Sequence, residues 1–217
     1  MPGSDLAVDV AGRWKGADRA VLLAHGAGAD RNAKTLVSVA EALAVAGVPS
    51  LRFDYPYRSA GRKSPDRPVV LDTATRSAAA ELARRSKLPP DRLVLGGRSM
   101  GGRYCSMVVA DESEPVAALG VLLLGYPLHP AGKPDRARVE HLGRLDLPAL
   151  FVSGTRDALA GRADLTSAVK KVPGAVTLHW LESADHGFRP LKSSGRTSDD
   201  VLDEVARVTT EWVTALR

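Results

Sequence analysis

Strand-like and helix-like patterns alternate along almost the whole chain, which predicts an α/β fold with a mainly parallel sheet covered by helices on both faces. Short uninterrupted apolar runs are typical of strands that are buried on both faces. Longer stretches with apolar residues at helical spacing lie between these runs. The 217 residues are enough for one core, so we expect a single domain over residues 1–217.

Seven strands are expected, at residues 6–10, 20–24, 50–53, 93–96, 118–124, 149–153 and 177–181. Six helices are expected between and after them, at residues 33–46, 73–87, 100–110, 139–145, 162–171 and 198–216. The last helix has the clearest pattern, because its apolar residues from Val201 to Leu216 form one stripe at helical spacing.

Composition narrows the range of functions. The 30 Lys and Arg residues exceed the 25 Asp and Glu residues by five, but they are scattered and do not alternate with aromatic residues, so nucleic-acid binding is not expected. The longest apolar run, residues 116–124, is too short to span a membrane, and we expect a cytoplasmic protein with no membrane partner. Cys105 is the single cysteine and is expected to be a buried structural thiol. The sequence leaves the oligomeric state open.

A G-x-S-x-G pattern stands directly after a predicted strand. Gly97-Arg98-Ser99-Met100-Gly101 follows the apolar residues 93–96 and opens the helix predicted over 100–110. Such a strand-to-helix turn is strained, and a Cβ atom at either glycine would collide with neighbouring backbone. The turn presents the serine hydroxyl at the carboxyl edge of the sheet, so Ser99 is the candidate nucleophile.

A loop of small residues, His25-Gly26-Ala27-Gly28-Ala29, follows the second predicted strand. Such a loop brings a backbone N–H group close to a substrate carbonyl oxygen. We expect an oxyanion to accept hydrogen bonds from the N–H groups of Met100 and Ala27, with Gly28 as the alternative second donor. His25 is expected to brace the loop.

Two more side chains follow predicted strands at the same edge. Asp157 comes after the strand at 149–153, and His186 lies in the loop after the strand at 177–181. A serine hydroxyl is a weak nucleophile at neutral pH, so we expect His186 to act as its base and Asp157 to orient the imidazole ring. Asp185 is the alternative acid, but neighbours on one loop usually point apart, which favours Asp157.

Two proline-rich loops, residues 54–68 and 125–134, also leave the carboxyl ends of strands and are expected to wall a substrate pocket. The second loop is too short for a helical lid, which predicts an open pocket for short or anionic acyl groups. The residues expected at this pocket are Gly28, Tyr55, Arg98, Tyr126 and His129.

Several arginines are expected near the active edge and are candidates for recognising a carboxylate or other anion, with a solvated surface role as the alternative. They are Arg52, Arg58, Arg98, Arg103, Arg136, Arg156 and Arg189, with Arg98 and Arg156 favoured above the others and pairing with a structural acid as the alternative for Arg98. No histidine pair or carboxylate cluster has the spacing of a metal site, and the glycines at 26–28 lack the spacing of a phosphate loop. We therefore expect neither a metal nor a cofactor.

Taken together, these motifs resemble the α/β-hydrolase superfamily, and within it a cap-less, dienelactone-hydrolase-like branch. The same set is similar to the hydrolase-like domain of a nonspecific-lethal chromatin-complex subunit. The motifs that carry the resemblance are residues 25–29, 53–56, 96–103, 125–130, 132–134, 154–157 and 185–186. The resemblance implies a single-domain α/β-hydrolase fold without a large cap, and a triad at Ser99, Asp157 and His186. Dienelactone hydrolase itself uses a cysteine nucleophile, so Ser99 argues against dienelactone as the substrate.

Two functions from different classes follow from the sequence. The first is a serine hydrolase that cleaves a small ester, thioester or lactone, with a small-molecule acyl substrate as its partner. The alternative is a binding or scaffold protein that keeps the hydrolase fold with a vestigial triad. The complete set of Ser99, Asp157 and His186 favours the enzyme.

Overall fold

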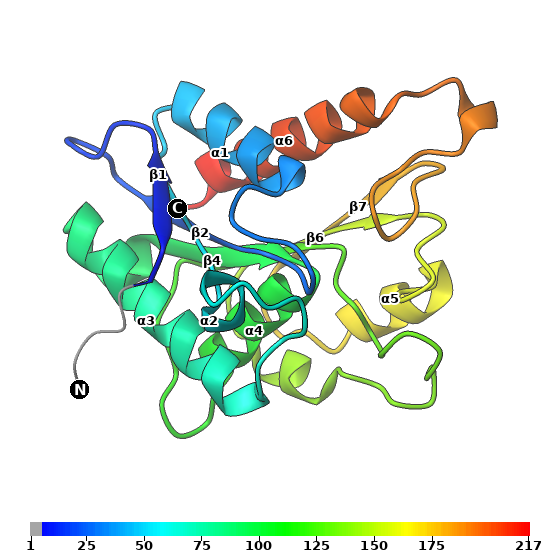
Figure 1. Ribbon diagram of the computed structural model, residues 1–217, viewed down its shortest axis with the longest axis horizontal. Helices are drawn as coiled ribbons and strands as arrows, with labels where there is room; N and C mark the ends of the chain where they lie inside the picture. Colours follow the sequence, from blue (N-terminus) through cyan, green and yellow to red (C-terminus); the bar gives the residue numbers. More distant parts are fainter. Residues whose placement is uncertain (1–5) are drawn as a thin grey trace.

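The computed structural model describes residues 6–217, which are built around one seven-stranded sheet (Figure 1). The strands are Val8–Ala11 (β1), Ala20–Ala24 (β2), Ser50–Phe53 (β3), Leu93–Arg98 (β4), Gly120–Leu124 (β5), Ala149–Gly154 (β6) and Val176–Leu181 (β7). Their order in the sheet is β1-β3-β2-β4-β5-β6-β7. β1 is antiparallel to β3 and every other pairing is parallel, which confirms the predicted α/β class.

Helices cover both faces of the sheet, and each face has its own core (Figure 1). The helices α1 (Lys34–Val45) and α6 (Ser198–Ala215) pack together on one face. The other face carries α2 (Pro56–Ser59), α3 (Pro68–Ser86), α4 (Met100–Val109) and α5 (Arg162–Val169). Three short 3₁₀ segments are η1 (Pro90–Arg92), η2 (Glu140–Arg144) and η3 (Lys192–Ser194). None of the helices that the structure describes is long and apolar enough to cross a bilayer.

The fold differs from the sequence prediction at three helices. α3 begins at Pro68 and not at residue 73, because proline fits the first helical position, where its missing N–H is not needed. The helix expected over 139–145 is the 3₁₀ segment η2, which contains Gly143. The predicted loop 54–68 includes the short helix α2, which begins with Pro56. Cys105 is buried as expected, and its Sγ donates to the Gly96 carbonyl oxygen at 3.3 Å.

η2 is joined to α4 by a buried polar contact. Ser106 Oγ lies 2.8 Å from His141 Nε2 and donates to the Arg103 carbonyl oxygen, so the imidazole nitrogen donates to the serine hydroxyl. Burial, together with the guanidinium groups of Arg103 and Arg144, lowers the pKa of His141 to about 4. His141 is therefore neutral at pH 7, and its protonation would place a charge inside the core.

This contact predicts acid sensitivity. An unfolded histidine titrates near pH 6.5, so the neutral form of His141 stabilises the fold above pH 6.5 and this stabilisation is lost as the pH falls from 6.5 towards 4. The loss is at most about 3 kcal/mol, from the size of the pKa difference. Urea unfolding from pH 7 to 4 should show wild type losing more stability than His141→Gln, which cannot titrate. A constant difference between the two proteins over this range would contradict the assignment.

Candidate active site

Ser99 occupies a tight turn between β4 and α4. Its backbone has φ 50° and ψ −113°, a conformation that a residue with a side chain rarely adopts. A Cβ atom at Gly97 would lie 2.1 Å from the Ala24 carbonyl oxygen, and one at Gly101 would lie 2.3 Å from the same oxygen. Both glycines are therefore required by the close approach of the turn to β2. The Ser99 N–H donates to the Leu124 carbonyl oxygen at 2.9 Å, which fixes the turn to β5 as well.

The side chains of Ser99, His186 and Asp157 form one hydrogen-bonded row. Ser99 Oγ lies 3.0 Å from His186 Nε2. On the other side of the ring, His186 Nδ1 donates to Asp157 Oδ2 at 2.8 Å, with Oδ1 at 3.0 Å. The Asp157 carboxyl group is fully buried, whereas 27% of the His186 side chain is exposed. A buried carboxylate on Nδ1 fixes the tautomer in which Nε2 is free to accept a proton from the serine.

Asp185 forms its hydrogen bonds within the turn that carries His186, with Gly187 and Arg189 as partners. Its Oδ1 accepts hydrogen bonds from the N–H groups of Gly187 at 2.7 Å and Arg189 at 3.0 Å. Burial acts to raise the pKa of Asp185, but these N–H groups and the Arg189 guanidinium outweigh it and hold the pKa below its usual value. Asp157, and not Asp185, is thus the carboxylate in contact with the ring.

The loop after β2 brings Ala27 beside the turn. The buried His25 donates from Nδ1 to the Gly26 carbonyl oxygen at 2.8 Å, and its Nε2 accepts from the Tyr55 N–H at 3.2 Å. Burial lowers the pKa of His25, which favours this neutral form. Within residues 6–217, the Ala27 N–H has no acceptor, and Met100 is the first residue of α4, where a helix leaves its N–H unpaired. Two donors are therefore available next to Ser99.

A cavity of about 310 Å³ adjoins Ser99. Its walls come from the loop after β2, the loop before α3, the start of α4 and the segment after β5. The residues that line it are Ala27, Pro65, Asp66, Leu71, Ser99, Met100, Arg103, Tyr104, Pro127, His129, Pro130, Ala131, Arg138 and Leu159. Of the residues predicted at the pocket, His129 lies in this wall, and both expected oxyanion donors line the same cavity.

Three of the predicted pocket residues do not line this cavity. The side chain of Tyr55 is fully buried, and its hydroxyl lies 3.0 Å from Thr75 Oγ1. Tyr126 is 1% exposed and donates its hydroxyl to the Arg138 carbonyl oxygen at 2.6 Å. Both tyrosines were expected in the pocket wall because they follow strands, but they find their polar partners inside the core. Gly28 adopts a φ of +76° in the loop and is not among the lining residues.

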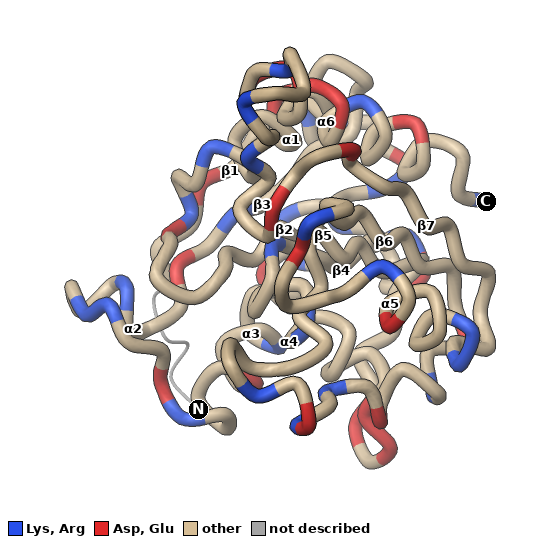
Figure 2. The backbone as a smooth tube through the Cα atoms, turned by 90° about the vertical axis from the view of Figure 1, so that its right-hand side faces the viewer, with Lys and Arg blue, Asp and Glu red and all other residues tan. Residues whose placement is uncertain are grey.

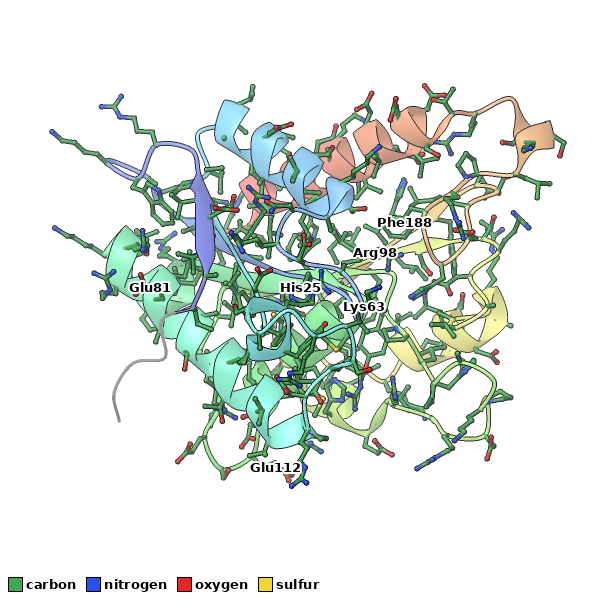
Figure 3. All side chains as sticks on the ribbon, viewed as in Figure 1. His25, Lys63, Glu81, Arg98, Glu112 and Phe188 are labelled. Carbon is green, nitrogen blue, oxygen red and sulfur yellow. The ribbon has the colours of Figure 1, made fainter. Side chains whose placement is uncertain are left out.

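Arg98 also does not line the cavity and supports the His186 loop instead (Figure 3). Its Nη1 donates to the Leu124 carbonyl oxygen at 3.1 Å, and its guanidinium carbon lies 4.1 Å from the centroid of the Phe188 ring. Burial lowers the pKa of Arg98 to about 10 against the opposing effect of the Asp157 and Asp185 carboxylates, so it is charged at neutral pH. These contacts favour a structural role for Arg98 over recognition of a substrate anion.

The sequence reasoning included Arg103 among the arginines that could bind an anion but did not place it in the pocket, and it missed Arg138. Arg103 had a usable signal, because it stands four residues after Ser99 and so lies on the same face of the predicted helix. Arg138 lies in an irregular stretch between β5 and η2, where no periodicity indicates which way a side chain points. In the described part of the chain, no group of three or more His, Cys, Asp or Glu residues is arranged to hold a metal ion.

A strand-to-helix serine with a His186–Asp157 pair at the carboxyl edge of a parallel sheet defines an α/β hydrolase-type site. The sequence pattern of the alpha/beta hydrolase domain family matches residues 17–214, and the chain belongs to this family.

Solved structures share the fold over nearly the whole chain. Est1E from Butyrivibrio proteoclasticus, in its structure with ferulic acid bound, is 16% identical with a TM-score of 0.74, covering 97% of this chain and 95% of its own. Dienelactone hydrolase from Anabaena variabilis is 23% identical with a TM-score of 0.69, covering 98% and 93%. A serine hydrolase without a lid from Xanthomonas campestris is 18% identical with a TM-score of 0.68, covering 100% and 93%. At these identities the likeness concerns the fold, and it supports a hydrolase fold without a cap.

The glycine requirement at the turn predicts a large stability effect. Gly101→Ala would place a Cβ atom 2.3 Å from backbone that cannot move aside, so the free energy of unfolding should fall by about 3 kcal/mol or more. Gly143→Ala is the matched control, because its nearest neighbour would lie 3.9 Å away, and it should change stability by about 0.5 kcal/mol or less. Equal effects in urea unfolding would refute the packing argument.

Proposed function

We propose that this protein is a serine hydrolase that cleaves a small ester, thioester or lactone through an acyl-enzyme on Ser99. The observation that carries the proposal is the hydrogen-bonded row from Ser99 through His186 to the buried Asp157, opening on a cavity. A serine hydroxyl needs a base in contact with it to act as a nucleophile, and this row supplies one.

The proposed reaction has two halves. In the first, Ser99 Oγ attacks the acyl carbon while His186 Nε2 takes the hydroxyl proton. The tetrahedral intermediate then expels the alcohol or thiol, which receives that proton from His186. In the second half a water molecule attacks the acyl-enzyme in the same way, and His186 returns the proton to Ser99. The acid product and free enzyme result.

The remaining groups stabilise charge during these steps. Asp157 holds the imidazole ring and balances the imidazolium that forms on it. The N–H groups of Met100 and Ala27 are proposed to receive the oxyanion, and the loss of one such donor costs about 3 kcal/mol of transition-state stabilisation. The first turn of α4 adds a dipole that favours the same negative charge.

The scaffold alternative lacks a supporting observation of its own. A vestigial site needs no buried carboxylate on the histidine and no cavity beside the serine, yet both are present. The similarity to the chromatin-complex subunit, a cytoplasmic location and the absence of nucleic-acid or membrane partners stay predictions. The absence of a cofactor also stays a prediction. It is consistent with the proposed steps, which use only side chains and backbone groups of this chain.

The role of Ser99 predicts a covalent adduct. A fluorophosphonate probe should label the wild-type protein at Ser99, because the serine is activated by His186. Ser99→Ala should lose the label while keeping its circular dichroism spectrum and unfolding midpoint. Ser106→Ala is the control, since Ser106 contacts a different histidine inside the core, and it should still be labelled. Labelling that persists in Ser99→Ala would overturn the proposal.

Replacing Asp157 and replacing Asp185 should lower the activity by different amounts. Asp157→Asn should lower kcat/KM on a p-nitrophenyl ester by roughly 10³- to 10⁴-fold, because an amide cannot hold the required tautomer. Asp185→Asn keeps an oxygen that accepts from Gly187 and Arg189, so it should cost about tenfold or less. The opposite ranking would mean that Asp185 is the working acid.

A further inference from the structure

The cavity beside Ser99 is lined by two arginines, Arg103 and Arg138. Arg103 lies one helical turn after Ser99 on α4, and its N–H donates to the Ser99 carbonyl oxygen at 3.0 Å. Arg138 comes from the segment between β5 and η2, whose backbone is fixed by the Arg138 N–H donating to the Leu128 carbonyl oxygen at 2.7 Å. Two separate elements thus bring like charges to one small space.

Neither guanidinium has a carboxylate partner within residues 6–217. The Arg103 Nε–H group is buried and finds no hydrogen-bond acceptor in the described chain. Other partly buried arginines in this protein do have such partners: Arg31 pairs with Asp9 and Asp54, and Arg76 pairs with Asp72 and Asp111. Both arginines are partly buried, and partly buried cations without an acidic partner favour an anionic ligand between them.

Burial lowers the pKa of Arg138, and the positive charge of Arg103 lowers it further. Because both arginines line the same cavity, an anion bound there would offset their mutual repulsion. Tyr104 lies beside Arg103, with the guanidinium carbon 5.7 Å from its ring centroid, so this wall of the cavity is aromatic as well as basic.

Asp66 is the one acid among the lining residues of this cavity. Its Oδ1 pairs with Arg62 at 2.6 Å, while its Oδ2 is buried without a partner. The cavity therefore carries two unpaired cations and one carboxylate whose charge is already balanced. The net charge of the lining is therefore positive, which favours an anion such as a carboxylate, the group that a planar guanidinium matches with two parallel hydrogen bonds.

The surroundings of the cavity strengthen its positive field. The wall-forming segments 58–67 and 131–138 together contain seven Lys and Arg residues against two Asp residues. Figure 2 shows Lys and Arg along the chain around α2, where the first of these segments begins. A cleft lined by one sign of charge concentrates ligands of the opposite sign and speeds their association at low salt.

We propose that this cavity binds a carboxylate on the acyl part of the substrate, through Arg103 and Arg138, so that the preferred substrates are half-esters or half-thioesters of short dicarboxylic acids. The proposal rests on the hydrolase function proposed for Ser99. The size of the cavity and the position of Arg103 favour a short acid: Arg103 stands one helical turn after Ser99, a rise of about 6 Å along the helix axis, and the cavity volume is about 310 Å³. A four- or five-carbon diacid spans such a gap.

The two arginines that the sequence favoured most for binding an anion, Arg98 and Arg156, do not compete for this role. Arg98 is occupied with the Leu124 carbonyl oxygen and the Phe188 ring. Arg156 is exposed, donates to the Ser183 carbonyl oxygen at 3.4 Å and is not among the residues lining this cavity.

The test compares two esters that differ only in charge, monomethyl glutarate and methyl glutaramate, with methanol release followed by NMR. Wild type should favour the carboxylate ester by about tenfold or more in kcat/KM, and added salt should reduce that preference. Arg103→Gln and Arg138→Gln should each lower the ratio of the two kcat/KM values about tenfold, mainly through KM. Arg136→Gln is the control, because Arg136 is exposed on the same segment, and it should leave the ratio unchanged.

A binding measurement separates this proposal from the hydrolase proposal. Glutarate should raise the unfolding temperature of Ser99→Ala, whereas glutaramide should not, and Arg138→Gln should remove the effect. Hydrolysis of both esters at equal rates, with no glutarate effect, would overturn the carboxylate site and leave the hydrolase intact. Glutarate binding without hydrolysis of either ester would support the carboxylate site and count against the hydrolase. Greater stabilisation by inorganic phosphate than by glutarate would overturn the choice of carboxylate.

Discussion

The close approach of the β4–α4 turn to the end of β2 is the constraint on which the candidate site depends. Gly97 and Gly101 both pack against the Ala24 carbonyl oxygen at distances that exclude a Cβ atom. That contact holds Ser99 at a positive φ and places its hydroxyl at the carboxyl edge of the sheet. The same contact sets the start of α4 beside the loop after β2, so the free N–H groups of Met100 and Ala27 adjoin the serine.

The arginines near this edge have separate physical roles. Arg98 joins the end of β5 to Phe188 and so supports the loop that carries His186. Arg103 and Arg138 line the cavity, and neither forms an ion pair with a carboxylate of residues 6–217. Arg98 therefore supports the catalytic geometry that we propose, whereas Arg103 and Arg138 give the cavity its positive charge. The lining of the cavity therefore carries more positive than negative side chains.

The sequence predicted the sheet well because buried parallel strands are apolar on both faces and their runs are easy to recognise. It also identified the residues that the structure brings together as Ser99, His186 and Asp157, because each follows a strand at one edge. It failed for Tyr55 and Tyr126, since a tyrosine in a loop can turn inwards when a buried oxygen accepts its hydroxyl. The direction of Arg98 and the position of Arg138 depend on tertiary contacts that no local pattern encodes.

Direct detection of the acyl-enzyme tests the central claim most directly. The protein is mixed with p-nitrophenyl acetate, quenched in acid within the first turnover, digested and examined by mass spectrometry. The account predicts one acetyl group on the peptide that contains Ser99, and a burst of p-nitrophenol close to one equivalent per protein. Turnover of the ester with acetyl on another residue, or with no acetyl-protein at any time, would contradict it.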